Sequence, residues 1–212
     1  MKHCAKELHV VSNGKMPIPQ LVEILADIHP YVAKFHLREK QKSARDLYQT
    51  MNLLTKSNVP VSKIVLNDRV DVALVTGAAG VQLAWHSLDV SVVKANFPRL
   101  TVGCSIHSIE EGIKAEQSNA DYLLYGHIFP SGSKPGLKPK GLEELKKITG
   151  FLSVPVIAIG GILPENAKQV LQVGAKGIAV MSGIFDAHDP VSAVKAYKNE
   201  IENGDVESGK GF

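Results

Sequence analysis

Residues 122–129 read Tyr122-Leu123-Leu124-Tyr125-Gly126-His127-Ile128-Phe129, an apolar run typical of a buried strand that ends with a glycine and a histidine. Seven more short, apolar, β-branched runs occur at 8–11, 34–37, 64–66, 81–83, 102–106, 156–159 and 178–181. The segments between them carry apolar residues three and four positions apart, as at Leu21, Leu25 and Ile28, which is typical of helices that cover a sheet. The chain therefore alternates predicted strands with predicted helices.

This alternation predicts the fold. Right-handed crossovers place each helix outside the sheet, so eight strand–helix repeats in 212 residues predict an α/β protein of the (β/α)8 TIM barrel type. A doubly wound open sheet is the alternative. We expect residues 1–202 to form this single barrel domain. Residues 203–212, which are polar and rich in glycine, are expected to form a flexible C-terminal tail.

Composition restricts the partners and the location of the protein. The net charge is +3 and the basic residues are scattered, which argues against nucleic-acid binding and favours a small anionic ligand. No segment approaches the roughly 20 apolar residues that span a bilayer, and no secretory signal is evident. Cys4 and Cys104 have no metal or redox spacing, so we expect reduced thiols in the cytoplasm. The sequence does not reveal the oligomeric state; a homodimer is one possible assembly, since closed dimers are the commonest among soluble proteins.

Two glycine-containing strand ends predict a phosphate site. Gly160 and Gly161 follow the seventh predicted strand, and Ser182 and Gly183 follow the eighth. In barrels these two loops commonly hold a phosphate, because bare backbone N–H groups point at it. The alternative is that the glycines only turn the chain.

Charged and amide side chains follow the second and third strands. Arg38 and Lys40 alternate with other residues, so both are able to meet a carboxylate or a phosphate, although a solvated strand end is equally compatible with the pattern. Asn67 and Asp68 close the third strand. Asn67 is a candidate substrate-binding residue, and Asp68 suits a helix N-cap as well as a ligand role.

His127 is the candidate catalytic residue, because an imidazole both takes and returns a proton near neutral pH. A lone histidine is more often structural, but this one ends a strand and precedes a polar loop. In that loop, Ser131, Ser133 and Lys134 are candidate substrate-binding residues. His107 is favoured as a loop residue, and the roles of His36 and His86 stay open.

Taken together, these residues resemble the thiamine phosphate synthase superfamily of barrels over roughly positions 7–200. In the synthases the second strand reads Gln-x-Arg-x-Lys, the third ends in Asn-Asp, the fourth reads Gly-Val-His before a metal-binding Asp, and the sixth reads Gly-Pro-x-Phe-x-Thr-x-Thr-Lys. The matching residues are Arg38, Lys40, Asn67, Asp68, Gly126, Phe129 and Lys134. The departures are His36 for Gln, Gln82 for His, Ser87 for the second metal-binding Asp, and His127 for Pro.

At the positions of these departures, the chain resembles the sister family of thiazole tautomerases (TenI-like proteins). The motifs of that family read Gly-His-x-Phe and Gly-Val-Gln-Leu. The stretches here that agree are 80–83, 105–108, 126–129, 157–162 and 181–185. This resemblance implies isomerisation of a carboxythiazole phosphate from its exocyclic tautomer to the aromatic ring, with His127 moving the proton. It also implies that the phosphate is held at Gly160, Gly161, Ser182 and Gly183, and that Arg38, Lys40 and Lys134 surround the ring carboxylate.

The same resemblance implies that neither a metal nor a cofactor is needed. Synthase chemistry relies on Mg²⁺ held by carboxylates, and Ser87 stands where one of the two is expected, although Asp68 is synthase-like. Two other functions remain open. One is a thiamine phosphate synthase, which is a transferase, and the other is a non-catalytic regulatory barrel that binds the same ligand.

Overall fold

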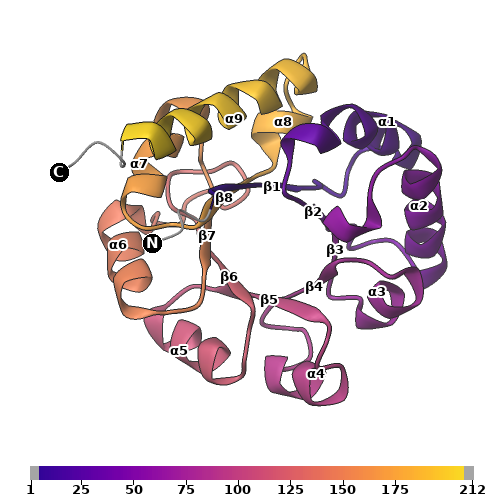
Figure 1. Cartoon of the computed structure of the whole chain (residues 1–212), viewed down its shortest axis with the longest axis horizontal. Helices are drawn as coiled ribbons and strands as arrows, with labels where there is room; N and C mark the ends of the chain where they lie inside the picture. The colour runs from indigo at the N-terminus through magenta and orange to yellow at the C-terminus, as the bar shows by residue number, and fades with distance from the viewer. Residues whose placement is uncertain (1–4, 208–212) are drawn as a thin grey trace.

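The computed structural model describes residues 5–207 of the chain. Eight parallel strands close into a barrel in chain order, and the last strand pairs with the first (Figure 1). The strands are β1 Glu7–Val11, β2 Lys34–Leu37, β3 Ile64–Asn67, β4 Gly80–Leu83, β5 Thr101–Ile106, β6 Tyr122–Gly126, β7 Val156–Ile159 and β8 Gly177–Val180. The predicted (β/α)8 barrel is confirmed, and the open sheet is not formed.

The helices lie around the outside of the ring of strands (Figure 1). They are α1 Ile18–Ile28, α2 Ala44–Lys56, α3 Val70–Thr76, α4 Val90–Asn96, α5 Ile109–Gln117, α6 Gly141–Phe151, α7 Pro164–Gln172, α8 Ser182–Phe185 and α9 Pro190–Glu207. Short 3-10 helices, η1 His29–Tyr31 and η2 Val61–Lys63, precede β2 and β3. The residues 203–207 thus continue α9, although the sequence predicted the tail from 203, and 208–212 lie outside the described residues.

Local sequence explains where several helices begin. Ser43 and Asp46 form a reciprocal capping box at the start of α2, and Pro164 opens α7. Asp68 does not cap α3, which is a correction to one of its two predicted roles. Its backbone has a φ of 65° and its N–H donates to the carbonyl of Gln82, so Asp68 extends the pairing of β3 with β4 and Arg69 takes the cap position.

Each strand has two faces that are buried differently. The outer faces and the helices share a large apolar core, which includes Leu123 and Tyr125 of β6. A separate apolar cluster lies on the inner faces and contains Val11, Leu124 and Ile157. Because successive side chains of a strand point to opposite faces, each short strand contributes to both the outer core and the inner cluster. Burial of each large side chain contributes about 1.5–3 kcal/mol, so the wall of the barrel is rigid enough to position the loops that follow the strands.

Within residues 5–207, none of the helices combines the length and the apolar character needed to cross a bilayer.

Candidate functional site

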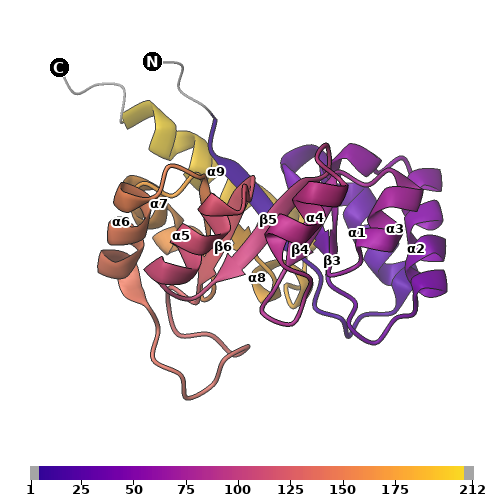
Figure 2. The same cartoon turned by 90° about the horizontal axis from the view of Figure 1, so that it is seen from below.

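The predicted site residues all lie at or after the carboxyl ends of strands, so the closed barrel carries them to one end of the molecule. We call this end, formed by the loops after the strands, the mouth. In Figure 2 the loop between β6 and α6 reaches furthest from the barrel, at the lower edge of the view. That loop carries Ser131, Ser133 and Lys134.

His127 directly follows β6 and is only 6 % exposed. Its Nε2 lies 3.2 Å from the carbonyl oxygen of Leu137, in the loop that leads to α6. A carbonyl only accepts, so Nε2 carries a proton, and whenever the ring is neutral Nδ1 is the acceptor. The main chain on both sides is also fixed, because the carbonyl of His127 accepts from the N–H of Lys140 and Ile128 donates to Ile159. The ring is therefore held in one place at the base of the β6–α6 loop.

Gly160 and Gly161 lie beside His127. A Cβ at Gly160 would come within 2.3 Å of Cβ of His127, and one at Gly161 within 2.4 Å of the carbonyl oxygen of Pro130. Both glycines have a positive φ, of 100° and 66°. Only glycine combines that backbone with so close an approach, so the β7–α7 loop can lie directly against the chain that follows β6. This packing accounts for part of the glycine pattern on structural grounds alone, and phosphate binding there stays a prediction.

The second half of the predicted phosphate cradle is the start of α8. Ser182 is exposed and opens this short helix, and a Cβ at Gly183 would meet the hydroxyl of Tyr197 at 2.1 Å. The hydroxyl of Tyr197 donates to the carbonyl of Ile162 at 3.0 Å. One buried tyrosine of α9 thus holds the β7–α7 loop and α8 together. Among residues 5–207, the N–H groups of Gly161 and Gly183 have no protein acceptor.

Arg38, which follows β2, lies beside Asn67, the last residue of β3, because the register of these strands aligns Leu37 with Leu66. Arg38 is half-buried and Lys40 is exposed. Within the described part of the chain, neither cationic side chain makes an ion pair or a hydrogen bond to the protein. Two cations without protein partners at the mouth favour an anionic ligand over a purely structural role.

Lys134 lies near two further basic groups on the opposite side of the mouth. Partial burial and the charge of Lys140 lower the pKa of the Lys134 ammonium. Burial and the charge of Lys134 lower the pKa of His107, against the opposing effect of Glu111, whose Oε2 lies 3.5 Å from Nδ1 of His107. His107 follows β5 and therefore lies in one of the loops of the mouth, where the sequence also placed it. Mutual repulsion of these groups is relieved when an anion binds between them.

The residues expected to hold Mg²⁺ in a synthase do not fit that ion here. Asp68 supplies one carboxylate, and its Oδ2 lies 3.8 Å from Nε2 of His86. Ser87 supplies no charge, and its hydroxyl accepts from the N–H of Ala84. No cluster of three or more His, Cys, Asp or Glu side chains suited to a metal occurs within residues 5–207. We therefore derive no step through a metal ion.

Sequence reasoning missed a polar cluster inside the barrel. Nδ1 of His9 lies 2.9 Å from Nε2 of His36, and both rings meet Tyr122 edge to face. Gln82 donates to the hydroxyl of Ser105 at 3.0 Å. A Cβ at Gly103 would fall 2.3 Å from Oε1 of Gln82, so glycine leaves room for these polar groups. The signal was available, since polar residues recur with period 2 in Glu7-Leu8-His9 and in Lys34-Phe35-His36.

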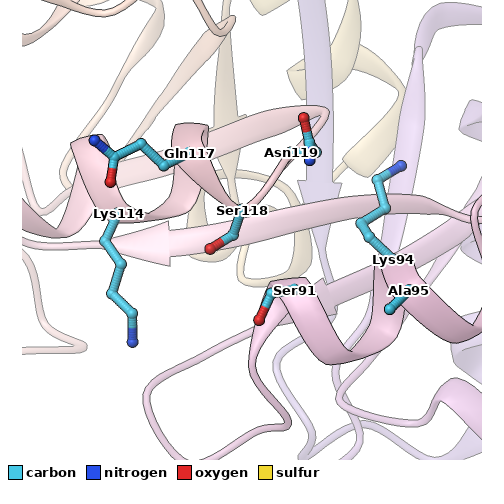
Figure 3. A pocket seen from close by; sticks show the side chains of 7 residues that line it. All are labelled: Ser91, Lys94, Ala95, Lys114, Gln117, Ser118 and Asn119. Atoms are coloured by element: carbon cyan, nitrogen blue, oxygen red, sulfur yellow. The ribbon is translucent and has the colours of Figure 1, made fainter.

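A surface cavity of about 350 Å³ lies between α4 and α5, on the outside of the barrel (Figure 3). The side chains of Lys94 and Lys114 point in opposite directions in this view. Lys94 pairs with Asp121 at 2.7 Å and Lys114 with Asp89 at 3.0 Å, so the charge of both lysines is already compensated. This cavity is not the site of the predicted chemistry, because no predicted site residue lines it.

The chain is similar to known proteins over most of its length. The model of a family described as thiamine monophosphate synthase matches residues 8–184. The thiamine-phosphate synthase of Pyrococcus furiosus is 34% identical over 199 residues, which cover 92% of this chain and 95% of the relative. That of Chlorobium phaeovibrioides is 42% identical over 171 residues, 79% of this chain and 82% of the relative. The solved structure named thiamine phosphate pyrophosphorylase from Pyrococcus furiosus superposes with a TM-score of 0.79 at 33% identity, covering 93% of this chain and 96% of that chain.

These comparisons correct the predicted function. The prediction of a thiazole tautomerase, and with it of an isomerase, is wrong, because curated relatives at 34% and 42% identity are named thiamine-phosphate synthases, which are transferases. The prediction gave most weight to Gln82, Ser87 and His127. A few substituted positions are a weaker guide to reaction class than similarity spread along the chain, since one barrel supports many chemistries through its loops.

Proposed function

Because the chain belongs to the thiamine monophosphate synthase family, we propose that it is a thiamine-phosphate synthase, a transferase that joins a pyrimidine pyrophosphate to a thiazole phosphate. In this reaction a bond forms between the two heterocycles as the bond to pyrophosphate breaks. Both substrates are small and carry phosphate groups, which fits the cations and the free backbone N–H groups at the mouth. The observation that carries the proposal is the set of unpaired cations there.

The pyrophosphate is proposed to bind among Arg38, Lys40 and Lys134. None of these side chains makes an ion pair within residues 5–207, and Lys140 adds positive charge beside Lys134. Arg binds phosphate oxygens through two parallel hydrogen bonds, and Lys acts as a point charge. Negative charge grows on the departing pyrophosphate, so fixed cations at this position stabilise the transition state more than the ground state.

The thiazole phosphate is proposed to bind to the loops after β7 and β8, at Gly160, Gly161, Ser182 and Gly183. The N–H groups of Gly161 and Gly183 have no protein acceptor in the described part of the chain, and the hydroxyl of Ser182 is exposed next to them. Tyr197 holds both loops in place through its bond to Ile162. A phosphate fixed there orients the thiazole ring for attack and reduces the entropy cost of the reaction.

His127 is proposed to contact the reacting rings, together with Asn67 and with Ser131 and Ser133 of the β6–α6 loop. The bond of its Nε2 to Leu137 leaves Nδ1 as the acceptor, and Gly160 brings the chain after β7 against its Cβ. This acceptor is suited to orient a substrate group that donates a hydrogen bond. The assignment to a transferase differs from the proton-shuttling role that the sequence predicted for His127.

The test is incubation of the purified protein with the pyrimidine pyrophosphate and the thiazole phosphate, with Mg²⁺ and separately with a chelator. Formation of thiamine phosphate together with one equivalent of pyrophosphate supports the proposal under either condition. Lys134→Ala is expected to lower kcat/KM, and Lys147→Ala, which removes an exposed lysine of α6, serves as the matched control. Absence of product under both conditions overturns the proposal.

A second candidate is a regulatory barrel that binds a thiazole phosphate without turnover. Ser87 favours it, because this residue leaves Asp68 as the single carboxylate of the expected metal site. Tight thiazole phosphate binding measured by calorimetry, with no thiamine phosphate formed, would establish this candidate in place of the transferase.

A further inference from the structure

Ser12 connects the end of β1 to the end of β2 through three hydrogen bonds. Its N–H donates to the carbonyl of His36 at 3.0 Å, and its hydroxyl accepts from the N–H of Arg38 at 2.9 Å. The same hydroxyl donates to Oε1 of Glu39 at 2.6 Å. A hydroxyl has one donor and two acceptor positions, so these contacts use its proton and fix its orientation. The backbone of His36 and Arg38 and the side chain of Glu39 are thereby tied to the residue that follows β1.

The Ser12–Glu39 pair lies behind the strand ends. Val11 belongs to the inner cluster and Leu37 to the outer core, so alternation places Ser12 and Glu39 on the outer side and Arg38 on the inner side. Ser12 is 3 % exposed and Glu39 is 7 % exposed. The space next to Ser12 is lined mostly by apolar side chains, such as Phe35 and Leu54, and is too narrow for a water molecule. Water therefore cannot replace the serine hydroxyl from that side.

Glu39 stands between two cations in the sequence and pairs with neither of them. Within residues 5–207, its carboxylate makes no ion pair, and its side-chain partner is the hydroxyl of Ser12. A buried carboxylate is tolerated only when it is hydrogen-bonded. This arrangement keeps the negative charge of Glu39 turned away from the mouth, so Arg38 and Lys40 stay available for an anion.

We propose that Ser12 and Glu39 are positioning residues that hold Arg38 and Lys40 toward the mouth without neutralising them. The inference rests on the proposed role of these two cations in binding pyrophosphate. When the serine hydroxyl is removed, Oε1 of Glu39 loses its donor in a buried place. Residue 39 then turns toward solvent and displaces the cations that flank it.

The experiment measures the binding of inorganic pyrophosphate by calorimetry, because this probe does not depend on turnover. Ser12→Ala is expected to weaken binding about tenfold, in line with the loss of a charge-assisted hydrogen bond. Glu39→Gln keeps an acceptor oxygen at the same position and is expected to stay within about threefold of the wild type. Ser192→Ala is the matched control, since its hydroxyl donates to Oδ2 of Asp189 at 2.5 Å and makes no hydrogen bond to Ser12, Arg38 or Glu39.

A double-mutant cycle separates positioning from general damage. If Ser12 acts through Glu39, the Ser12→Ala/Glu39→Gln double variant binds no more weakly than Ser12→Ala alone. The proposal is overturned if the losses of affinity in the two single variants multiply in the double variant. It is also overturned if Ser12→Ala binds pyrophosphate as tightly as the wild type. If Ser12→Ala does not fold, Glu39→Met replaces it and is expected to bind about tenfold more weakly than Glu39→Gln; equal affinities overturn the proposal.

The failure of this inference is distinguishable from failure of the proposed function. Wild-type protein that binds pyrophosphate but forms no thiamine phosphate contradicts only the transferase. Active protein whose KM for the pyrimidine pyrophosphate is unchanged in Ser12→Ala contradicts only the positioning role.

Discussion

Nδ1 of His9 lies 2.9 Å from Nε2 of His36 inside the barrel, and Nε2 of His9 lies 3.0 Å from Oε2 of Glu7. The carboxylate of Glu7 can only accept, so Nε2 of His9 carries a proton and Nδ1 of His9 accepts from His36. Nδ1 of His36 is then unprotonated, and it has no partner among the described residues. A single carboxylate at the start of β1 thus determines which nitrogens of two successive rings carry protons.

These two histidines predict that stability falls in mild acid. Burial lowers the pKa of His36, with further lowering by His9 and Lys34, and burial lowers the pKa of His9 against the opposing effect of Glu7. Lys176 also lowers the pKa of His9, and Tyr122 faces both rings without a charge. Below the ordinary histidine pKa of about 6.5, the unfolded chain takes up protons that the folded chain excludes. The contribution of these two histidines to the free energy of unfolding is therefore fully present above that pH and is lost as the pH falls below it.

Urea unfolding between pH 5 and pH 7.5 measures this effect. Each histidine changes the free energy of unfolding by up to about 1.4 kcal/mol per pH unit in this range. His36→Gln should reduce the slope by the share of one histidine, and an unchanged slope would show that His36 is not the source.

Gly160→Ala is expected to destabilise the fold. The new Cβ would lie 2.3 Å from Cβ of His127, on a backbone with φ of 100°. Overpacking costs about 1–3 kcal/mol and the left-handed backbone costs about 1–2 kcal/mol, so a loss of about 2–5 kcal/mol is expected in the free energy of unfolding. Gly132→Ala is the control, because nothing lies within 4 Å of a Cβ at that position. Equal stability of the two variants would mean that the β7–α7 loop does not lie against His127.

Lys134→Ala is expected to weaken pyrophosphate binding. A hydrogen bond to a charged group contributes about 1.5–3 kcal/mol, which corresponds to a loss of affinity of about 10- to 100-fold. The pKa of Lys134 is lowered by partial burial and by Lys140, so the neutral fraction of this ammonium grows as the pH rises through an alkaline range below its usual pKa. Affinity of the wild type should therefore decline in that range. Lys147→Ala should bind like the wild type, and a loss of the same size in both variants would remove Lys134 from the site.

Tyr197→Phe is expected to loosen the phosphate-binding wall of the mouth. The variant leaves the buried carbonyl of Ile162 without its donor, which costs about 1–3 kcal/mol. Thermal unfolding should show the loss, and the KM for the thiazole phosphate should rise while the KM for the pyrimidine pyrophosphate stays the same. Tyr48→Phe, at an exposed position of α2, is the control. A uniform rise in both KM values would indicate general damage instead of a local effect.

The fold was predictable because the apolar runs, the helical periodicity between them and the capping signals all pointed to the same alternation of strands and helices. The run that ends in Gly126 and His127 forms β6 and continues into the mouth, and the capping signals at Ser43 and Pro164 lie where helices begin. Asp68 was harder to place, because its left-handed backbone and its bond to Gln82 depend on the pairing of β3 with β4. The sequence alone does not distinguish a residue that caps a helix from one that extends a strand.

The placement of the candidate residues at the mouth was predictable from the sequence, and their contacts were less so. Strand order brings Arg38, Asn67 and Lys134 to the mouth, since each lies at or after the end of a strand. The bond of His127 to Leu137 depends on the path of the β6–α6 loop, which no periodicity encodes. The reaction class was mispredicted because it depended on a few substituted positions, such as Ser87, and similarity along the whole chain gave the opposite answer.

Pairing of β8 with β1 has a consequence for biosynthesis. Until residues 177–180 emerge from the ribosome, β1 and β7 each present a row of unpaired backbone groups, which is a template for joining other chains. Closure of the ring removes both edges at once, and it has to wait until the chain has been synthesised through β8. We therefore expect nascent chains that stall before β8 to aggregate, and chaperones that shield sheet edges to matter most during that interval.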